Sequence, residues 1–298
     1  MSDDDTLCND PLDDTWRLKC PVTCAGCTHR PSAAPTTSGS TVSHPNDEGG
    51  GPGAGAGVAS GVPERIGSSR EHEHDMLMIT MEAMTAAHDQ GRLQGGYKEG
   101  YLKDRSWSGN SHIGNRREQS TWYYDLAREL RPRKICEIGM NGGHSAALFL
   151  MAADDDASLV MFDLLKYSYS SATVKLVQSM FPSQIEVVKG DSTVEVPKLP
   201  DRTCDLFSVD GDHRYPGAKL DIYNAINKTK VGGTLILDDM QLRPTRQAFD
   251  EVVREGLLTE INCIENVPIM VSRLNRKDTT NVRRLQMSWC TGKVPPAR

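Results

Sequence analysis

The chain has 298 residues, of which 38% are hydrophobic and 25% are charged, and its formal net charge is -6. The length allows one domain of roughly 200 residues plus tails, and the low hydrophobic content indicates that a sizeable part lies outside a packed core. The acidic balance argues against a nucleic-acid partner, and no apolar run reaches the ~18 residues that a membrane-spanning helix needs. The acidic N-terminus lacks the apolar segment of a signal peptide, so we expect a cytoplasmic protein.

Half of the eight cysteines lie near the N-terminus, at Cys8, Cys20, Cys24 and Cys27. The segment Cys-Pro-Val-Thr-Cys-Ala-Gly-Cys, residues 20–27, resembles the end of a ShK toxin-like domain, with fewer cysteines than that domain usually has. The resemblance implies disulfides and an oxidising compartment, hence a secreted or organellar protein whose gene model is truncated. A zinc site fits poorly because no suitably spaced histidine accompanies the thiols. A disordered tail with incidental cysteines is the remaining alternative.

Residues 28–70 are rich in Pro, Gly, Ser and Ala. The stretch 49–57 has no aromatic and no branched aliphatic side chain, so it cannot bury enough apolar surface to offset the loss of chain entropy. We therefore expect a cysteine-containing segment at 1–27, a disordered linker at 28–70 and a folded domain at 71–298.

Helical and strand patterns alternate in the folded part. Leu77, Met81 and Met84 recur at helical spacing and predict a helix from residue 73 to about 91, and residues 118–130 predict a second helix that ends before Pro132. The loop 91–115 between them is expected to cover the site as a lid. Strands are predicted at 135–138, 158–163, 185–189, 204–209, 232–237, 260–263 and 284–289, and helices at 146–151, 170–181, 216–228 and 246–256. This alternation predicts an α/β fold, a Rossmann-like, seven-stranded, mostly parallel sheet with helices on both faces.

A glycine-rich turn follows the first of these strands, in the sequence Glu-Ile-Gly-Met-Asn-Gly-Gly-His-Ser at 137–145. Gly139, Gly142 and Gly143 stand where the backbone must turn sharply, and Ser145 is expected to cap the next helix. Such a turn is the usual place for a nucleotide-like ligand. Its spacing resembles motif I of class I S-adenosylmethionine (SAM) methyltransferases, in which the strand-one acid, here Glu137, holds the amino-acid end of SAM.

Acids occur at the ends of the first five predicted strands, where ligands collect in a parallel sheet: Glu137, Asp163, Asp191, Asp210 and the pair Asp238–Asp239. One such aspartate is usually a turn or cap residue, but five coincidences indicate a site. Asp163 is placed to accept the ribose hydroxyls, and the Asp191–Ser192 turn to meet the adenine amino group. The last three acids would repel one another without a cation, and a hard ion such as Mg²⁺ prefers oxygen ligands.

Together with Val-Asp-Gly-Asp-His-Arg-Tyr at 209–215, these motifs resemble the class I family known as methyltransferase domain 24, over residues 73–289. The resemblance implies SAM as cofactor, bound by Glu137, Gly139, Asn141, Gly142, Gly143, Ser145, Asp163, Asp191, Ser192 and Asp210. In metal-dependent O-methyltransferases of similar build, the matching acids hold Mg²⁺, which implies Asp210, Asp238 and Asp239 as ligands. The matching proton acceptors fall on Asp212 or His213. The chain departs from the family at Pro216, where an acid is common.

We therefore expect a SAM-dependent methyltransferase that O-methylates a small hydroxylated acceptor, such as a sugar or a phenol, with the help of Mg²⁺. A homodimer is an assembly that the sequence allows. One alternative keeps the fold and changes the reaction, as in cephalosporin hydroxylase-like proteins. Another is a non-enzymatic binding module that docks through its cysteine segment. For His213, a purely structural, hydrogen-bonded role is the alternative to that of a base.

Overall fold

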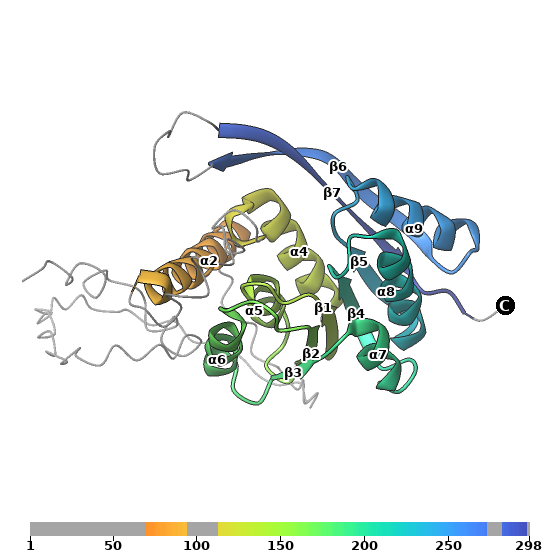
Figure 1. Ribbon diagram of the computed structural model, residues 1–298, viewed down its shortest axis with the longest axis horizontal. Coiled ribbons are helices and arrows are strands. Elements are labelled where there is room, and N and C mark those ends of the chain that lie inside the picture. The colour runs from red at the N-terminus through yellow and green to blue at the C-terminus, as the bar shows by residue number, and fades with distance from the viewer. Residues whose placement is uncertain (1–68, 94–112, 273–281, 297–298) are drawn as a thin grey trace, which may run out of the picture.

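The computed structural model describes residues 69–93, 113–272 and 282–296 (Figure 1). Its helices are α2 (Arg70–Leu93), α4 (Arg117–Leu130), α5 (His144–Ala152), α6 (Ser170–Met180), α7 (Ser192–Glu195), α8 (Tyr215–Lys228) and α9 (Arg243–Arg254), with short 3₁₀ helices at Ile113–Asn115 and Val196–Lys198. Its strands are β1 (Lys134–Ile138), β2 (Ser158–Asp163), β3 (Ile185–Lys189), β4 (Cys204–Val209), β5 (Thr229–Leu237), β6 (Thr259–Ser272) and β7 (Val282–Lys293). The expected cysteine segment, nearly all of the linker and most of the expected lid lie outside the described residues.

The strands form one seven-stranded sheet in the order β3-β2-β1-β4-β5-β7-β6. The first five strands are parallel to their neighbours, and β7 runs antiparallel to both β5 and β6. Helices α2, α4, α5 and α6 lie on one side of the sheet and α7, α8 and α9 on the other (Figure 1). This arrangement confirms the predicted fold class. Among the described helices, none is both long and apolar enough to cross a membrane.

The sheet is buried on both faces, which explains why its strands read as nearly continuous apolar runs. Successive residues of a strand point to opposite faces. On β2, Leu159 and Met161 pack into the core that includes α4 and α5, whereas Val160 and Phe162 pack into the core that includes α8 and α9. The two cores fix the strands, and thereby the positions of the residues at their carboxyl ends.

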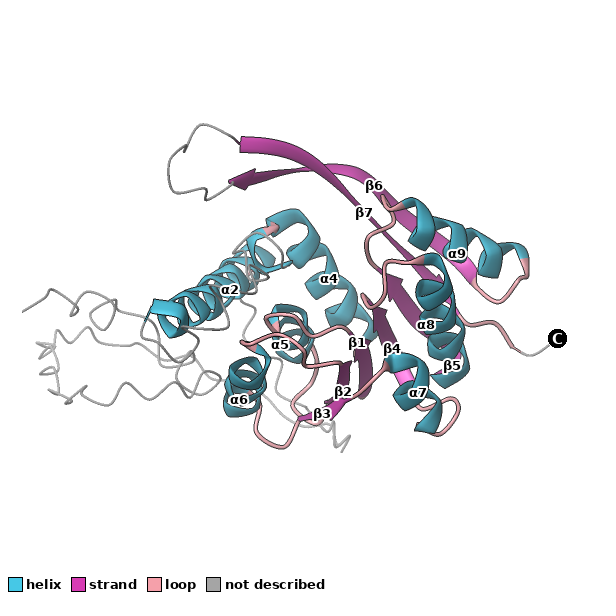
Figure 2. Ribbon diagram, in the orientation of Figure 1, coloured by secondary structure: helices cyan, strands magenta, loops and turns pink. Residues whose placement is uncertain are grey.

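The predicted bounds of β2, β3 and β4 are confirmed at both ends. The last two strands are much longer than expected, because beyond the sheet they continue as a ribbon in which β6 and β7 pair with each other (Figure 2). The predicted cap at Ser145 is wrong. Gly143 occupies the cap position with a φ of 76°, and Ser145 lies inside the first turn of α5. Left-handed backbone of this kind favours glycine over serine.

Two disulfides each join a pair of neighbouring strands in the sheet, and neither pairing was predicted from the sequence. Cys136 on β1 is bonded to Cys204 on β4, and Cys263 on β6 to Cys290 on β7. These four are the cysteines of the described residues, so each of them is paired. The first disulfide ties together the two strands that carry Glu137 and lead to Asp210.

Candidate active site

The turn after β1 is built so closely against β4 that a side chain at Gly139 has no room. Gly139 has a φ of 96°, and a Cβ atom there would lie 2.0 Å from the carbonyl oxygen of Asp210. Gly143 has a φ of 76°, and its Cβ would lie 2.5 Å from Cγ1 of Val177. Geometry thus explains two of the three predicted glycines, Gly139 and Gly143, and the turn lies against the backbone of Asp210.

Side chains from α2 and from the segment before α6 hold this turn in place. His88 lies 3.0 Å from the carbonyl oxygen of Gly142, and the hydroxyl of Tyr169 donates to Oδ1 of Asn141 over 2.9 Å. Burial lowers the pKa of His88. His144 is buried, with Nε2 3.1 Å from Oγ1 of Thr85 in α2. His144 therefore links the turn to α2.

The tips of β2 and β3 hold their predicted cofactor residues in different ways. Asp163 accepts hydrogen bonds from the backbone amides of Met140 and Leu165, at 2.8 and 2.6 Å, so its carboxylate lies against the glycine turn. Asp191 caps α7 by accepting from the backbone N–H of Thr193, and Ser192 donates to Asp221 over 2.6 Å. Asp163 is joined directly to the glycine turn, whereas Asp191 caps α7 after β3 and Ser192 links α7 to Asp221 of α8.

Glu137 is a buried acid without a full set of partners. Its side chain is 1% exposed; Ser145 hydrogen-bonds to the carboxylate, but Oε2 has no hydrogen-bond partner among the described residues. Burial, with smaller contributions from the charges of Asp210, Asp163 and Asp238, raises the pKa of Glu137 to about 8. Glu137 faces a pocket, open to solvent, that is also lined by Arg116, Tyr123, Asn141, Asp210 and Asp238.

A second group of polar residues lies at the ends of β4 and β5. Nε2 of His213 is 3.3 Å from Oδ1 of Asp210 and 3.0 Å from Oδ2 of Asp239. Hydrogen bonds to Asp210 and then Asp239 raise the pKa of His213 to about 10. Gln241 donates to the other oxygen of Asp239 over 2.6 Å. Ligand atoms of Asp210, His213 and Asp239 lie within 4.8 Å of one another, which is compatible with one metal ion.

Asp238 lies beside this group and makes different contacts. Its Oδ1 accepts from Nε2 of Gln119, at 2.8 Å, and from the backbone N–H of Asp239, at 2.7 Å. Loss of hydration, followed by the charges of Asp210 and Asp239, raises the pKa of Asp238 to about 8. The three predicted metal ligands are therefore neighbours, but the structure groups two of them with His213.

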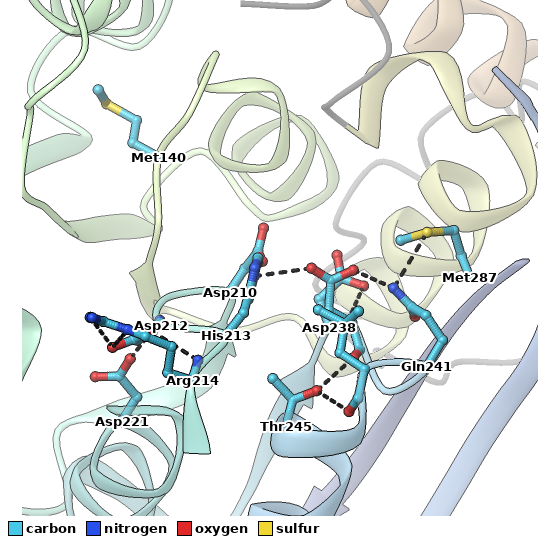
Figure 3. Close-up of polar contacts among 12 residues, drawn as sticks. Met140, Asp210, Asp212, His213, Arg214, Asp221, Asp238, Gln241, Thr245 and Met287 are labelled. Atoms are coloured by element: carbon cyan, nitrogen blue, oxygen red, sulfur yellow. Dashed lines mark hydrogen bonds and ion pairs between the residues drawn. The ribbon is translucent and has the colours of Figure 1, made fainter. Parts of the chain in front are cut away.

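The two predicted catalytic residues, Asp212 and His213, lie apart although they are adjacent in sequence. The carboxylate of Asp212 accepts from Nε and Nη2 of Arg214, at 2.9 and 2.7 Å, and this contact lowers the pKa of Asp212. Figure 3 shows Asp212 beside Arg214, away from Asp238 and Gln241. His213 is thus the candidate that lies with the acids.

The sequence analysis missed three residues of the site: Arg116, Gln119 and Gln241. Gln119 could have been noticed as a polar residue on the side of α4 that faces the core, where it is 1% exposed. Gln241 follows the acidic pair closely. Arg116 belongs to no motif, and its role depends on contacts that are distant in the sequence.

Comparisons with known proteins agree with this geometry. A family model described as a methyltransferase domain matches residues 136–240, from β1 to just beyond β5. Among solved structures, a putative O-methyltransferase from Klebsiella pneumoniae is 14% identical, with a TM-score of 0.50, and the match covers 72% of this chain and 99% of that one. Cofactor-bound Rv0187 from MTB is 16% identical, with a TM-score of 0.50 and coverage of 73% and 89%. The search of curated proteins found no match.

The sheet order and the glycine turn define a class I methyltransferase fold. Residues 136–240 of this fold match the model of a methyltransferase domain, and they are the part of the chain that carries the glycine turn and the acids at the ends of β2, β3, β4 and β5.

Proposed function

We propose that the chain binds SAM against the glycine turn and transfers its methyl group to a hydroxyl of a small acceptor, such as a sugar or a phenol. The observation that carries this proposal is Glu137, a buried acid with an unpartnered oxygen, facing a cavity beside a turn that only glycine can form. The ammonium group of SAM would satisfy that oxygen and favour the ionised carboxylate. The residues present therefore fit the cofactor.

The acids at the ends of β4 and β5 support a site for a divalent cation such as Mg²⁺. Asp210 and Asp239 offer hard oxygen ligands, and Asp238 lies next to them. The imidazole of His213 lies between Asp210 and Asp239. When bound, such an ion lowers the pKa of a hydroxyl that it contacts. In this proposal, Asp210 and Asp239 hold the cation, and Asp238 completes the acidic surface.

In the reaction, the acceptor oxygen attacks the methyl carbon of SAM, the carbon–sulfur bond breaks to leave S-adenosylhomocysteine (SAH), and the acceptor loses its proton. We assign the proton to His213, whose ring is about half exposed at the site. In the empty site its raised pKa keeps the ring protonated, so in this proposal a cation held by Asp210 and Asp239 would lower that pKa and leave the ring neutral, able to act as the base. Asp212, the other candidate, would first have to give up its two-point contact with Arg214. Alignment of the two substrates is the main demand of an in-line transfer.

We also infer that the protein matures in an oxidising compartment. Disulfides persist in such compartments and are rare in the cytosol, and all four cysteines of the described residues are paired. This inference takes the place of the cytoplasmic location that the N-terminal sequence suggested.

Replacing Asp163 with asparagine is expected to weaken the binding of SAH by about 10-fold or more, because a charged acceptor for hydroxyl groups is worth ~1.5–3 kcal/mol. Calorimetric titration of SAH into the full chain measures the effect. The matched control is Asp156→Asn, a change at an exposed position after α5. If the unaltered chain binds neither SAM nor SAH, the proposed cofactor is wrong.

Replacing Asp239 with asparagine is expected to weaken the binding of Mn²⁺, a spectroscopic substitute for Mg²⁺, by at least about 10-fold, because one of two charged ligands becomes neutral. Electron paramagnetic resonance of free Mn²⁺ measures the effect, again with Asp156→Asn as control. Equal affinity in the three proteins would rule out a metal site at Asp239.

A further inference from the structure

A guanidinium and a carboxyl group line the pocket beside the glycine turn, and each has a buried atom with no hydrogen-bond partner among the described residues. Arg116 lies directly before α4, and its Nε atom is buried without a partner within the part of the chain that the structure describes. Glu137 is the second, through Oε2. Both side chains line the same pocket beside the glycine turn.

Unpartnered polar groups inside a protein are costly, so such a pair needs an explanation. The simplest solution would be an ion pair between Arg116 and Glu137, yet no such pair is formed among the described residues. A ligand that carries a cation and an anion side by side would satisfy both. An α-amino acid, with its ammonium and carboxylate on one carbon, has this arrangement.

We infer that Arg116 and Glu137 together recognise the α-amino-acid end of the cofactor, with Arg116 donating to its carboxylate and Glu137 accepting from its ammonium. This inference rests on the proposed function and adds to it a residue that lies in no recognised motif. Arginine suits the task because its planar guanidinium can donate two parallel hydrogen bonds to a carboxylate.

The alternative role for Arg116 is to balance the charge of the acids at the ends of β4 and β5. The charge of Arg116 does act on these acids, because it lowers the pKa of Asp210 and of Asp238. Burial has the larger effect and raises both pKa values. However, Gln119 stands between: its Oε1 accepts from Nη1 of Arg116 over 3.3 Å, and its Nε2 donates to Asp238. Charge balance needs no hydrogen bond, so it leaves the N–H at Nε of Arg116 without an acceptor and does not explain why this donor is buried.

The experiment compares three ligands by calorimetry: SAH, its decarboxylated analogue, which keeps the amine, and 5′-methylthioadenosine, which has neither charged group. Arg116→Met is expected to weaken SAH binding by about 10- to 100-fold, while the affinity for the decarboxylated analogue stays within about 2-fold of that of the unaltered chain. Arg117→Met is the matched control, because Arg117 is the exposed neighbour and bonds to Asp75. Glu137→Gln is expected to weaken binding of both amine-containing ligands but not of methylthioadenosine.

Melting temperatures of the variants establish that they are folded, and Arg116→Lys, which keeps the charge, is expected to recover part of the SAH affinity. If Arg116→Met weakens all three ligands equally, or none, Arg116 does not read the carboxylate and the inference is overturned. If the unaltered chain binds none of the three ligands, the proposed function fails and this inference fails with it. The two failures are thus distinguishable.

Discussion

Replacing Glu137 with glutamine is expected to stabilise the ligand-free protein at alkaline pH while it weakens cofactor binding. The pKa of this carboxyl is raised from 4.5 to about 8 by burial, so between these values the unfolded chain loses a proton that the folded chain keeps. The free energy of unfolding therefore falls as the pH rises from about 4.5 to about 8. Glutamine cannot ionise, so this loss disappears in the variant.

The gain in free energy of unfolding has an upper limit of about 5 kcal/mol above pH 8, at roughly 1.4 kcal/mol for each unit of pKa shift, and is expected to vanish below pH 4.5. Urea denaturation of both proteins at pH 5, 7 and 9 measures it. Glu186→Gln is the matched control, because Glu186 is an exposed acid on β3. A wild type and a Glu137→Gln variant with the same pH dependence would show that Glu137 ionises normally when buried.

This prediction expresses a conflict between stability and function. An acid kept away from water destabilises the empty protein when it ionises, and the same burial lets it bind a cation strongly once the ligand excludes water. Strained or unsatisfied residues of this kind are concentrated at functional sites. For Glu137, the destabilisation and the proposed ligand contact arise from one atom, Oε2.

The strands and the acids at their tips could be predicted from the sequence because both depend on local pattern. Apolar runs bounded by turns specify β2, β3 and β4, and a parallel sheet necessarily collects its strand ends at one edge. The partners of those acids could not be predicted in the same way. Asp238 bonds to Gln119, which is 119 residues away, and this contact exists only after α4 has packed on the sheet.

Two further differences have local causes that a pattern does not reveal. Asp212 is held by Arg214, only two residues later, so its removal from the acidic group depends on the direction that the backbone takes after β4. Gly143 rather than Ser145 caps α5, because the chain enters the helix through left-handed backbone. To predict the disulfide between Cys136 and Cys204, one must know that β1 lies beside β4. The order of the strands along the chain does not give this.

Removing this disulfide is expected to have the largest effect on stability after that of Glu137. The double variant Cys136→Ala and Cys204→Ala opens a loop of 68 residues. Because the unfolded chain is then no longer restricted by the bond, the free energy of unfolding is expected to fall by about 4 kcal/mol. The corresponding pair at Cys263 and Cys290 closes a loop of 27 residues, for which the same relation gives about 3.5 kcal/mol. Urea denaturation without reductant measures both double variants.

The unaltered chain treated with reductant is the control for atoms removed by mutation, because reduction breaks the bonds and leaves the sulfur atoms in place. Peptide mapping of unreduced protein is expected to recover the peptides of Cys136 and Cys204 joined together, and likewise those of Cys263 and Cys290. If all four thiols are instead free to alkylate in the unfolded chain, the disulfides are absent and the inferred oxidising compartment is wrong. If they are joined, the strands that carry Glu137 and lead to Asp210 are covalently tied, by a kind of bond that is rare in cytosolic proteins.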